Sequence, residues 1–315
     1  GNTTSHTQTI TVQDTIAPVI ETEASDMVVN CEEGNTETLN AWLSSNGGAI
    51  ASDLCSEITW SNNFETLSNN CGATGSATVI FTATDACGNI STTTATFTIV
   101  DTRAPMILVP AQDESIECAE AGNLTALENW VQNHGNAAAR DLCSGVIWTN
   151  NYTGFEAECG QAGSVTVTFF ATDSCGNQNS TTGTFTITDN TSPIIETEAA
   201  NVVVDCNGAG NTEALTSWLE DNGGASATDE CSEISWSNNF ETLSDDCGAT
   251  GSVTVIFTAT DECGNTSATT ATFTIQDTLA PTIETQAAGL TVDCDGAGNT
   301  TELTAWLNSF GGALA

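Results

Sequence analysis

The chain has 315 residues, of which 41 are acidic, two are arginine and none is lysine, giving a formal net charge of −39. A phosphate backbone or an anionic membrane surface would repel such a chain, which argues against binding to nucleic acid or to lipid head groups. No apolar run approaches the roughly 20 residues needed to span a bilayer. Tryptophan, phenylalanine and β-branched residues recur in register and can fill a core, which argues against disorder.

One sequence pattern recurs along the chain. Its most regular mark is a linker proline, because Pro18, Pro105, Pro193 and Pro281 are 87, 88 and 88 residues apart. A unit of this length forms a domain with its own core rather than one layer of a solenoid. We therefore divide the chain into the end of one repeat, three complete repeats and the start of another, which are residues 1–15, 16–102, 103–190, 191–278 and 279–315.

Both ends of the chain are expected to be partial repeats. Gly1-Asn2 aligns with Gly88-Asn89, so residues 1 to 14 match the last strand of an earlier repeat. Cys294 matches the first cysteine of a repeat, and by the Cys31 to Cys71 spacing its third cysteine would lie 40 residues further on.

A short helix is predicted near the start of each repeat. After a first strand at Met27 to Asn30, the segment Asn35 to Gly48 places Leu39, Trp42 and Leu43 at i, i+3 and i+4. This pattern predicts an amphipathic helix that is capped by an asparagine or threonine side chain and ended by a glycine pair. At this spacing the tryptophan is expected in the core rather than on a sugar-binding surface. The same interpretation applies to Trp130, Trp218 and Trp306 on the helices and to Trp60, Trp148 and Trp236 on the following strands.

The longest regular pattern in each repeat predicts a β-hairpin. From Ser76 to Pro105, Val79 and Phe81 alternate with threonine and isoleucine, a turn follows at Asp85 to Asn89, and Phe97 again alternates with threonines. A period of two places one face of each strand inward. We therefore predict an all-β fold of tandem β-sandwich domains, each with a short inserted helix.

Each complete repeat has four cysteines, which predict two disulfides and an oxidising, extracytoplasmic compartment. Cys71 and Cys87 flank one strand whose ends lie roughly 30 Å apart, so they should not pair with each other. If Met27 to Asn30 runs parallel to the last strand, Cys31 lies at the same end of the domain as Cys71, and Cys55 lies with Cys87 at the other. The predicted pairs are Cys31–Cys71 with Cys55–Cys87, Cys118–Cys159 with Cys143–Cys175, and Cys206–Cys247 with Cys231–Cys263. The alternative, a zinc site, lacks a C-x-x-C pair or a closely spaced histidine.

These motifs together carry a family resemblance. The run T-A-T-D-x-C-G-N, followed by T-x-T-F-T-I and D-T-x-A-P, resembles the HYR-like (hyalin-repeat-like) Ig-like domains. With the helix N-T-x-x-L-x-x-W-L, the chain is similar to the repeats of giant Bacteroidota surface adhesins, notably the SprB-type gliding adhesins. The resemblance implies Ig-like β-sandwiches in series, type IX secretion, anchoring at the outer surface and a role in attachment or gliding. The second repeat departs most, at Leu108 to Pro110 and at Gly145.

The sequence favours a structural function over catalysis. His6 and His134 are the only histidines and neither occupies a repeated position, so we predict that the chain is not an enzyme. The resemblance implies a filament segment of a cell-surface adhesin, with a surface or extracellular ligand such as a glycan, the outer-membrane secretion and motility machinery, and other copies in a filament as partners. The alternatives are a glycan-binding repeat array and a matrix or ice-binding protein, the last suggested by threonine ladders such as Thr78, Thr82 and Thr84.

The linkers suggest stiffness and two modification sites. They are short and contain a proline of fixed φ, so we expect a stiff rod with a rise on the order of 40 Å per repeat. Bacteroidota proteins resembling this one carry O-glycans at Asp-(Ser/Thr)-aliphatic sequences. These occur here at Thr15 and Thr278, whereas Arg103 breaks the pattern at Thr102. The alternative is that both linker threonines are unmodified.

Calcium is the expected cofactor, at the junctions between repeats. With the disulfide pairing above, the linker aspartate, the aspartate before the second cysteine and the aspartate of the hairpin turn converge at one end of each domain. Calcium takes six to eight oxygen ligands and relieves the repulsion among clustered carboxylates. The alternative is that the aspartates only hydrogen-bond their own turns. The candidate ligand sets are Asp14, Asp53 and Asp85; Asp101, Asp141 and Asp173; and Asp189, Asp229 and Asp261, with Asn89, Asn177 and Asn265 as neutral ligands.

Overall fold

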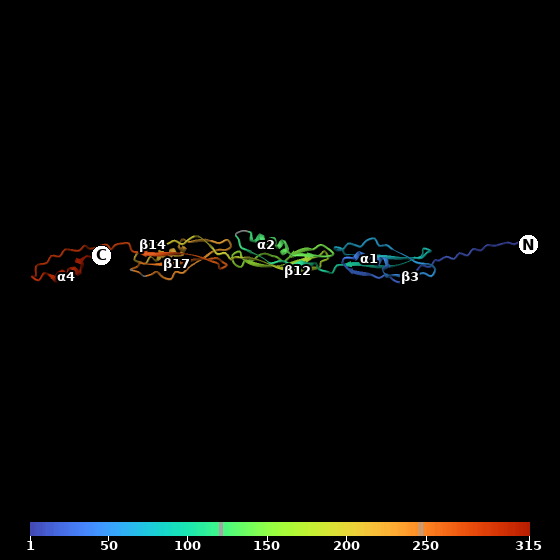
Figure 1. The fold of residues 1–315 in the computed structure, drawn as a ribbon, viewed down its shortest axis with the longest axis horizontal. Helices are drawn as coiled ribbons and strands as arrows, with labels where there is room; N and C mark the ends of the chain where they lie inside the picture. Colours follow the sequence, from blue (N-terminus) through green and yellow to red (C-terminus); the bar gives the residue numbers. More distant parts are fainter. Residues whose placement is uncertain (120–121, 245, 247) are drawn as a thin grey trace. The chain divides into compact units, whose positions relative to one another are not determined.

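The computed structural model describes residues 1–119, 122–244, 246 and 248–315. The chain divides into two compact units, Gly1–Asp189 and Asn190–Ala315. Figure 1 follows the chain through them in colour, and the first unit contains the first two complete repeats.

The three complete repeats contain the same elements in the same order. The first repeat has β1 (Val19–Thr22), β2 (Met27–Asn30), α1 (Asn35–Ser44), the 3-10 turn η1 (Asn46–Gly48), β3 (Ile50–Ser52), β4 (Thr59–Asn62), β5 (Gly75–Thr84) and β6 (Ile90–Val100). The second has β7 (Met106–Val109), β8 (Glu114–Glu117), α2 (Asn123–Gln132), η2 (His134–Asn136), β9 (Ala138–Arg140), β10 (Ile147–Asn150), β11 (Gly163–Thr172) and β12 (Gln178–Thr188). The third has β13 (Ile194–Thr197), β14 (Val202–Asp205), α3 (Thr212–Glu220), η3 (Asn222–Gly224), β15 (Ser226–Thr228), β16 (Ser235–Asn238), β17 (Gly251–Thr260) and β18 (Thr266–Gln276).

Each repeat is built from one large and one small sheet. In the first repeat the large sheet has the order β2-β6-β5-β4, and β1 pairs with β3 in the small sheet. The pair β5 and β6 is the predicted hairpin, with ten residue pairs from Gly75–Ile99 to Thr84–Ile90. β2 runs parallel to β6, as the cysteine argument required. The predicted all-β fold of tandem β-sandwiches, each with an inserted helix, is confirmed.

The core of the first repeat lies between the hairpin and the helix. Phe81 and Phe97 on the hairpin are fully buried. Trp42 on α1 places its ring centroid 5.2 Å from that of Phe81 and 5.4 Å from that of Phe97, and its indole N–H donates to the Ser25 carbonyl oxygen at 3.1 Å. Because the indole is both packed and hydrogen-bonded, the core interpretation of the helix tryptophan is confirmed. Figure 1 shows the equivalent helix of the second repeat, α2, beside β12.

The helix termini differ from the prediction at one end. The residue before α1 is Gly34 in the left-handed conformation (φ 94°), and no side chain caps the first turn. The predicted asparagine or threonine cap is therefore wrong, because Gly34 occupies the capping position and Asn35 is already the first residue of the helix, where its side chain donates to the Asn30 carbonyl oxygen at 3.1 Å. The prediction that a glycine pair ends the helix is correct. Gly47 has φ 65°, and a Cβ there would lie 3.0 Å from the Phe81 ring, so the turn after the helix needs a glycine.

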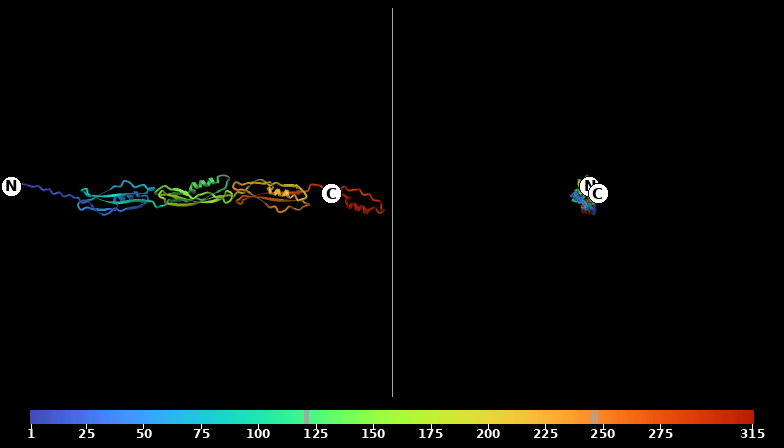
Figure 2. Two further views of the ribbon diagram at one scale, coloured as in Figure 1. Left: turned by 180° about the vertical axis from the view of Figure 1, so that it is seen from behind. Right: turned by 90° about the vertical axis from the view of Figure 1, so that its right-hand side faces the viewer.

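The two terminal segments lack the sheets of the complete repeats. Residues 1–18 form no strand and run as a single extended segment at the N-terminus (Figure 2). Ile10 and Val12 are 83% and 94% exposed. The strand expected at residues 1 to 14 is not formed, because no described strand lies beside it to supply hydrogen bonds. Residues 279–315 form the helix α4 (Thr300–Asn308) and the turn η4 (Phe310–Gly312). Within the described ranges, no helix combines the length and the apolar character that a membrane crossing requires.

Candidate functional site at the junction between repeats

The two ends of each repeat carry different cysteines. Cys31 directly follows β2 and donates its backbone N–H to the carbonyl oxygen of Val100, where β6 ends. Cys71 precedes β5 at the same end. We call this the trailing end, since the chain leaves the repeat there. Cys55, after β3, and Cys87, in the hairpin turn, lie at the opposite end, which we call the leading end.

The disulfides connect the trailing end of the first repeat to the leading end of the second. Cys31 is bonded to Cys143, with a Cα–Cα distance of 5.9 Å, and Cys71 is bonded to Cys175, with a Cα–Cα distance of 5.2 Å. Two disulfides therefore span a single linker in the first unit.

This arrangement corrects the predicted pairing. Cys31–Cys71 and Cys143–Cys175 are wrong because all four cysteines bond across the junction. Cys55–Cys87 and Cys206–Cys247 are also wrong, because Cys55, Cys87 and Cys206 are free thiols, and Cys247 lies outside the described residues. The prediction placed Cys31 with Cys71 and Cys143 with Cys175 at the correct ends, but these cysteines bond to the neighbouring repeat rather than to each other. Cys118, Cys159, Cys231 and Cys263 are disulfide-bonded as well, and Cys294 is free.

Main-chain contacts hold the same junction. The backbone N–H of Ala73 donates to the carbonyl oxygen of Cys143 at 2.8 Å. A Cβ on the preceding residue, Gly72, would lie 2.5 Å from that carbonyl oxygen, and Gly72 has φ +59°. The backbone of the second repeat therefore approaches too closely for any other residue at position 72. This role was missed, and a glycine after the third cysteine of every complete repeat was the available signal.

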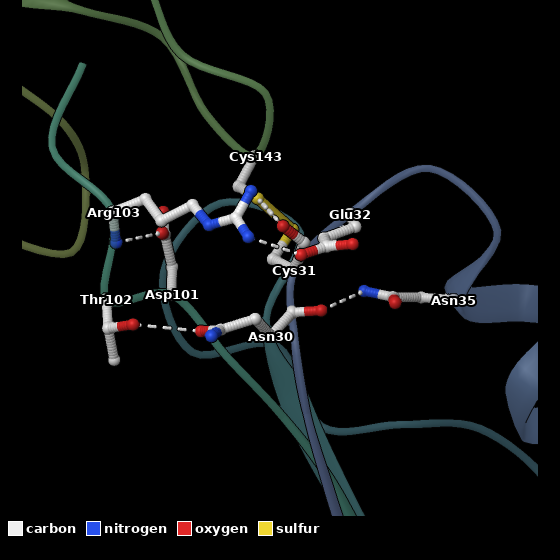
Figure 3. A network of polar contacts seen from close by, with 8 residues as sticks. All are labelled: Asn30, Cys31, Glu32, Asn35, Asp101, Thr102, Arg103 and Cys143. Carbon is white, nitrogen blue, oxygen red and sulfur yellow. Dashed lines mark hydrogen bonds and ion pairs between the residues drawn. A yellow bond between two sulfur atoms is a disulfide. The ribbon is translucent and has the colours of Figure 1, made fainter. Parts of the chain in front are cut away.

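The linker adds polar contacts, shown in Figure 3. The guanidinium of Arg103 forms an ion pair with the Glu32 carboxylate at 2.6 Å. The Thr102 hydroxyl donates to the Asn30 side-chain oxygen at 2.9 Å. Both ion-pair partners are about half exposed, and exposed pairs of this kind contribute only about 0–1 kcal/mol. These contacts orient the linker, while the disulfides provide most of the stabilisation of the junction.

A cleft of about 360 Å³ adjoins the Cys31–Cys143 disulfide. The two arginines of the chain, Arg103 and Arg140, both line it, together with Asp101 and Asp141. Positive charge in this protein is thus concentrated at one junction, where it offsets part of the negative charge of the aspartates.

Three carboxylates converge at the leading end of the first repeat, as the sequence predicted. One ligand atom from each of Asp14, Asp53 and Asp85 lies within 4.8 Å of the other two. Asp53 Oδ1 accepts from the backbone N–H groups of Cys55 and Ser56, both at 2.9 Å. Both oxygens of Asp85 accept hydrogen bonds within its own turn. Asn89 donates to Oδ1 through its backbone at 2.8 Å and to Oδ2 through its side chain at 2.7 Å. Asp85 therefore hydrogen-bonds its own turn, as the alternative to calcium predicted, and it also lies close to Asp14 and Asp53.

Asp14 is the member of this cluster whose carboxylate can still bind a ligand. Its Oδ1 accepts from the Ile16 backbone N–H at 3.1 Å, but its Oδ2 is buried and has no hydrogen-bond partner. A buried acceptor left without a donor costs free energy, so a ligand at this atom would stabilise the fold. Because the chain has no lysine and both arginines line the other cleft, no lysine or arginine side chain neutralises this cluster.

A related arrangement occurs at the next junction, where Asp101 pairs with each of the other two aspartates. A carboxylate oxygen of Asp101 lies within 4.8 Å of one from Asp141, and likewise of one from Asp173. Asp101 Oδ2 is again buried without a partner, while its Oδ1 accepts from the Arg103 backbone N–H at 3.1 Å. Asn177 donates to the Asp101 carbonyl oxygen at 3.2 Å, as Asn89 does to Asp14 at 3.3 Å. Cys143 and Cys175 lie in these groups, but their sulfurs are bonded in disulfides, so the carboxylates are the available ligands.

The third predicted set is divided between the two units. Asp189 ends the first unit, and its Oδ2 is buried. In the second unit, Asp229 Oδ1 accepts from the backbone N–H groups of Cys231 at 2.9 Å and Ser232 at 3.0 Å. Asp261 accepts from the Asn265 backbone and side chain, both at 2.8 Å. Asp229 and Asp261 thus have the local geometry of their counterparts in the first unit.

Two groups at this end of the first repeat, Asp85 and Cys55, have shifted pKa values. Burial raises the pKa of Asp85, but hydrogen bonds from the Asn89 side chain and from the Asn89, Cys87 and Gly88 backbones outweigh it, so the pKa lies below its ordinary value. The pKa of the Cys55 thiol is raised, first by the negative charge of Asp14 and then by burial and the charges of Asp53, Cys87 and Asp85. The hydrogen bonds to Asp85 therefore favour its ionised form, while the nearby negative charge favours the protonated form of the Cys55 thiol.

The two candidate glycosylation sites differ in their contacts. Both threonines are exposed. The Thr278 hydroxyl donates to Asp205 Oδ1 at 2.6 Å, which occupies the atom that a glycan would modify. Thr15 is thus the more accessible of the two.

Comparison with known proteins identifies no family. No family model and no curated protein matches the sequence. Solved structures of cadherin repeats match at low similarity. The protocadherin gammaB4 extracellular domain is 13% identical over 82% of this chain and 49% of that chain, with a TM-score of 0.25. Drosophila N-cadherin EC1-4 is 15% identical over 73% and 68%, with a TM-score of 0.24, and mouse cadherin-23 EC22-24 is 12% identical over 83% and 99%, with a TM-score of 0.27. The chain spans about half the length of the protocadherin gammaB4 structure, and TM-scores this low carry no argument about its function.

Proposed function

We propose that this chain is a load-bearing structural segment of a long extracellular filament, a surface adhesin that acts in attachment, in gliding motility or in both. The observation that carries the proposal is the pair of disulfides that joins the first repeat to the second. Disulfides of this kind persist in oxidising, extracytoplasmic compartments. The HYR-like and SprB-type motifs of the sequence support the same assignment and the type IX route of export.

The covalent connectivity suits a segment under tension. A force along the backbone reaches Cys31 and crosses the disulfide to Cys143, which lies 112 positions later, so the sequence between the two cysteines carries no load while the bond is intact. Unfolding the first sandwich then releases little chain, because only its residues before Cys31 carry the load. Without the bond the residues between the two cysteines would extend by roughly 3.3–3.6 Å each, or on the order of 400 Å. A filament that transmits force between a cell and a surface needs this resistance to extension.

Calcium is the proposed cofactor of the junctions. Three carboxylates within 4.8 Å of one another, of which one has a buried oxygen without a partner, form an oxygen-rich site that suits a hard divalent cation. Asp14, Asp53 and Asp85 would hold the ion at the leading end of the first repeat. Asn89 uses its amide N–H groups on Asp14 and Asp85, which leaves its side-chain oxygen as a neutral ligand. The ion would tie the incoming linker to the loop and the hairpin turn.

Two experiments test the function. Single-molecule stretching of the full chain from its two ends should give short extensions under oxidising conditions and longer ones, by about 400 Å for the Cys31–Cys143 loop, after reduction. Equal extensions in both states would show that the bonds carry no load. Antibodies against the chain, added to intact producing cells, should label the outer surface and reduce attachment to glass. Labelling that requires lysis would refute the surface location.

No specific contact favours the alternative functions. Among the exposed threonines of the first hairpin, the Thr78 and Thr96 hydroxyls bond to each other at 3.0 Å, which is a contact within the sheet rather than with a ligand. The filament therefore remains the proposal.

A further inference from the structure

The leading end of the first repeat has the form of a bonded junction without its partner. Cys55 and Cys87 occupy the positions of Cys143 and Cys175, but both are exposed free thiols. The loop around Cys55 is already formed, because Asp53 Oδ1 accepts from the Cys55 and Ser56 backbones at 2.9 Å, as Asp141 does in the second repeat at 2.8 and 2.9 Å.

The hairpin turns match as well. The Ser56 hydroxyl accepts from the Ala86 backbone N–H at 3.0 Å, and the Ser144 hydroxyl accepts from Ser174 at 3.0 Å. These bonds fix the loop to the turn and so fix the spacing of the two thiols. The free leading end therefore presents its cysteines in the same arrangement as the end that is bonded.

The bonded junction shows what such an end binds. Against the trailing end of the first repeat, Cys143 is only 7% exposed and Leu142 is 52% exposed, whereas the equivalent leucine at the free end, Leu54, is 95% exposed. The surface that meets Cys143 consists of a cysteine, a glycine without a Cβ to obstruct the approach and the N–H of Ala73. Another repeat of this kind offers the same three features.

We propose that the leading end of the first repeat, formed by residues 53–56 and 85–89, is a docking surface for the trailing end of another repeat of the same kind. Two disulfides close the joint, one from Cys55 to the first cysteine of the incoming repeat and one from Cys87 to its third. The repeats thereby join head to tail in a single direction. This inference rests on the equivalence of the cysteines and is independent of the adhesive role.

Bond formation requires an oxidant, and a small-molecule disulfide such as glutathione disulfide suffices. A thiolate of the incoming repeat attacks one sulfur of the oxidant, which forms a mixed disulfide and releases one thiol. The Cys55 thiolate then attacks the protein sulfur of the mixed disulfide and releases the second thiol. Each bridge thus oxidises two cysteines, reduces one oxidant to two thiols and transfers the two cysteine protons to them.

The test extends the full chain by one repeat. Residues 1–102 are joined to residues 16–315, which duplicates the first repeat across an Asp-Thr-Ile-Ala-Pro linker. Serine replaces Cys55 and Cys87 in the first copy, so these two cysteines occur only in the second. After oxidation with glutathione disulfide and digestion with pepsin, mass spectrometry should find Cys31–Cys55 and Cys71–Cys87 linkages beside the Cys31–Cys143 and Cys71–Cys175 linkages. In the original chain, oxidised in parallel, Cys55 and Cys87 should instead react with an alkylating agent or carry glutathione.

Two results would overturn the proposal. One is a Cys55–Cys87 linkage in the extended chain. The other is a Cys31–Cys71 linkage in which the first copy closes on itself, while Cys55 and Cys87 carry glutathione. A Gly72→Ala substitution in the first copy alone provides a control for docking, because a Cβ there obstructs the approach. It should lower the yield of Cys31–Cys55 and leave that of Cys31–Cys143 unchanged. Equal yields with and without the substitution would show that the linkage forms without docking.

Discussion

Cys31 and Cys143 are 112 residues apart in the sequence, yet their Cα atoms lie 5.9 Å apart because the two cysteines form a disulfide. Cys31 belongs to the end at which the chain leaves the first repeat, and Cys143 to the end at which the next repeat begins. A bond of this kind fixes the relation of two domains rather than the closure of one. The first two predictions test that relation directly.

Removal of the Cys31–Cys143 bond should destabilise the first unit. In the chain-entropy model, a loop of 112 residues contributes about 5 kcal/mol at 25 °C. We expect Cys31→Ser to lower the stability in guanidinium unfolding, followed by tryptophan fluorescence, by an amount approaching this value. Cys55→Ser is the matched control, since Cys55 is a free thiol and its loss removes no bridge. Identical unfolding midpoints for the two variants would mean that the bridge does not stabilise the native state.

Gly72→Ala should weaken the junction more than Gly248→Ala. Both glycines have a left-handed backbone, with φ +59° and +64°, so alanine costs each about 1–2 kcal/mol of backbone strain. Only at Gly72 would the new Cβ meet the Cys143 carbonyl oxygen, at 2.5 Å, while a Cβ at Gly248 meets nothing within 4 Å. We expect faster reduction of Cys31–Cys143 by dithiothreitol in Gly72→Ala alone, measured by mass spectrometry. The same rate in both variants would exclude steric contact across the junction.

Calcium should raise the melting temperature of the chain. At a free concentration about 100 times the Kd, one bound ion adds about 2.7 kcal/mol, which corresponds to a shift on the order of 5–10 °C for a unit of this size. Chelation should reverse the shift. Asp14→Asn and Asp101→Asn, which alter the aspartates with buried, unpartnered oxygens, should each reduce it. Melting that is insensitive to calcium and to both substitutions would leave the carboxylates as turn residues only.

The Cys55 thiol offers a second measure of the same site. Because the negative charge of Asp14 is the largest cause of its raised pKa, a cation bound there should lower that pKa and speed alkylation at mildly alkaline pH. The Asp14→Asn variant should react faster than the parent in chelator and respond less to calcium. An unchanged rate on calcium addition to the parent would place the ion elsewhere.

Acid should weaken the first repeat through Asp85. Its folded-state pKa is below the ordinary value of 3.8, so its contribution to stability is fully present above that value and is lost as the pH falls through the lower folded-state pKa. Denaturant midpoints measured across this range should decline at the acidic end. Asp85→Asn should lack that part of the decline. A decline of equal size in the variant would assign it to other carboxylates.

If native material is glycosylated in the linkers, Thr15 should be modified in preference to Thr278. The Thr278 hydroxyl is hydrogen-bonded to Asp205, and no such contact protects the exposed Thr15. Intact-mass analysis of native protein should show added glycan mass that is largely lost in Thr15→Val and retained in Thr278→Val. A mass equal to that of the sequence would show that both linkers are unmodified.

Local patterns in the sequence determined the domain fold. Alternation of Val79 and Phe81 with outward-facing residues is enough to predict a buried hairpin, because a strand has a period of two. The spacing of Leu39 and Trp42 likewise predicts the buried face of a helix. The convergence of Asp14, Asp53 and Asp85 was also predicted, although from a Cys55–Cys87 pairing that is wrong. It holds without that bond because strand direction places both loops at the same end of the sheet.

Only the tertiary structure decided which cysteine bonds to which. Cys31 and Cys71 share an end of the domain, and the pattern within one repeat cannot distinguish two cysteines that face each other from two that face a neighbour. The choice depends on how closely the linker brings the next repeat, which is visible in the approach of the Cys143 carbonyl oxygen to Gly72. The predicted helix cap was wrong for a related reason, because Gly34 occupies the capping position and Asn35 begins the helix, where its side chain donates to the Asn30 carbonyl oxygen at the end of strand β2. The spacing of apolar residues indicates which side of a helix or strand is buried. The partners of a side chain depend instead on contacts between elements and between repeats.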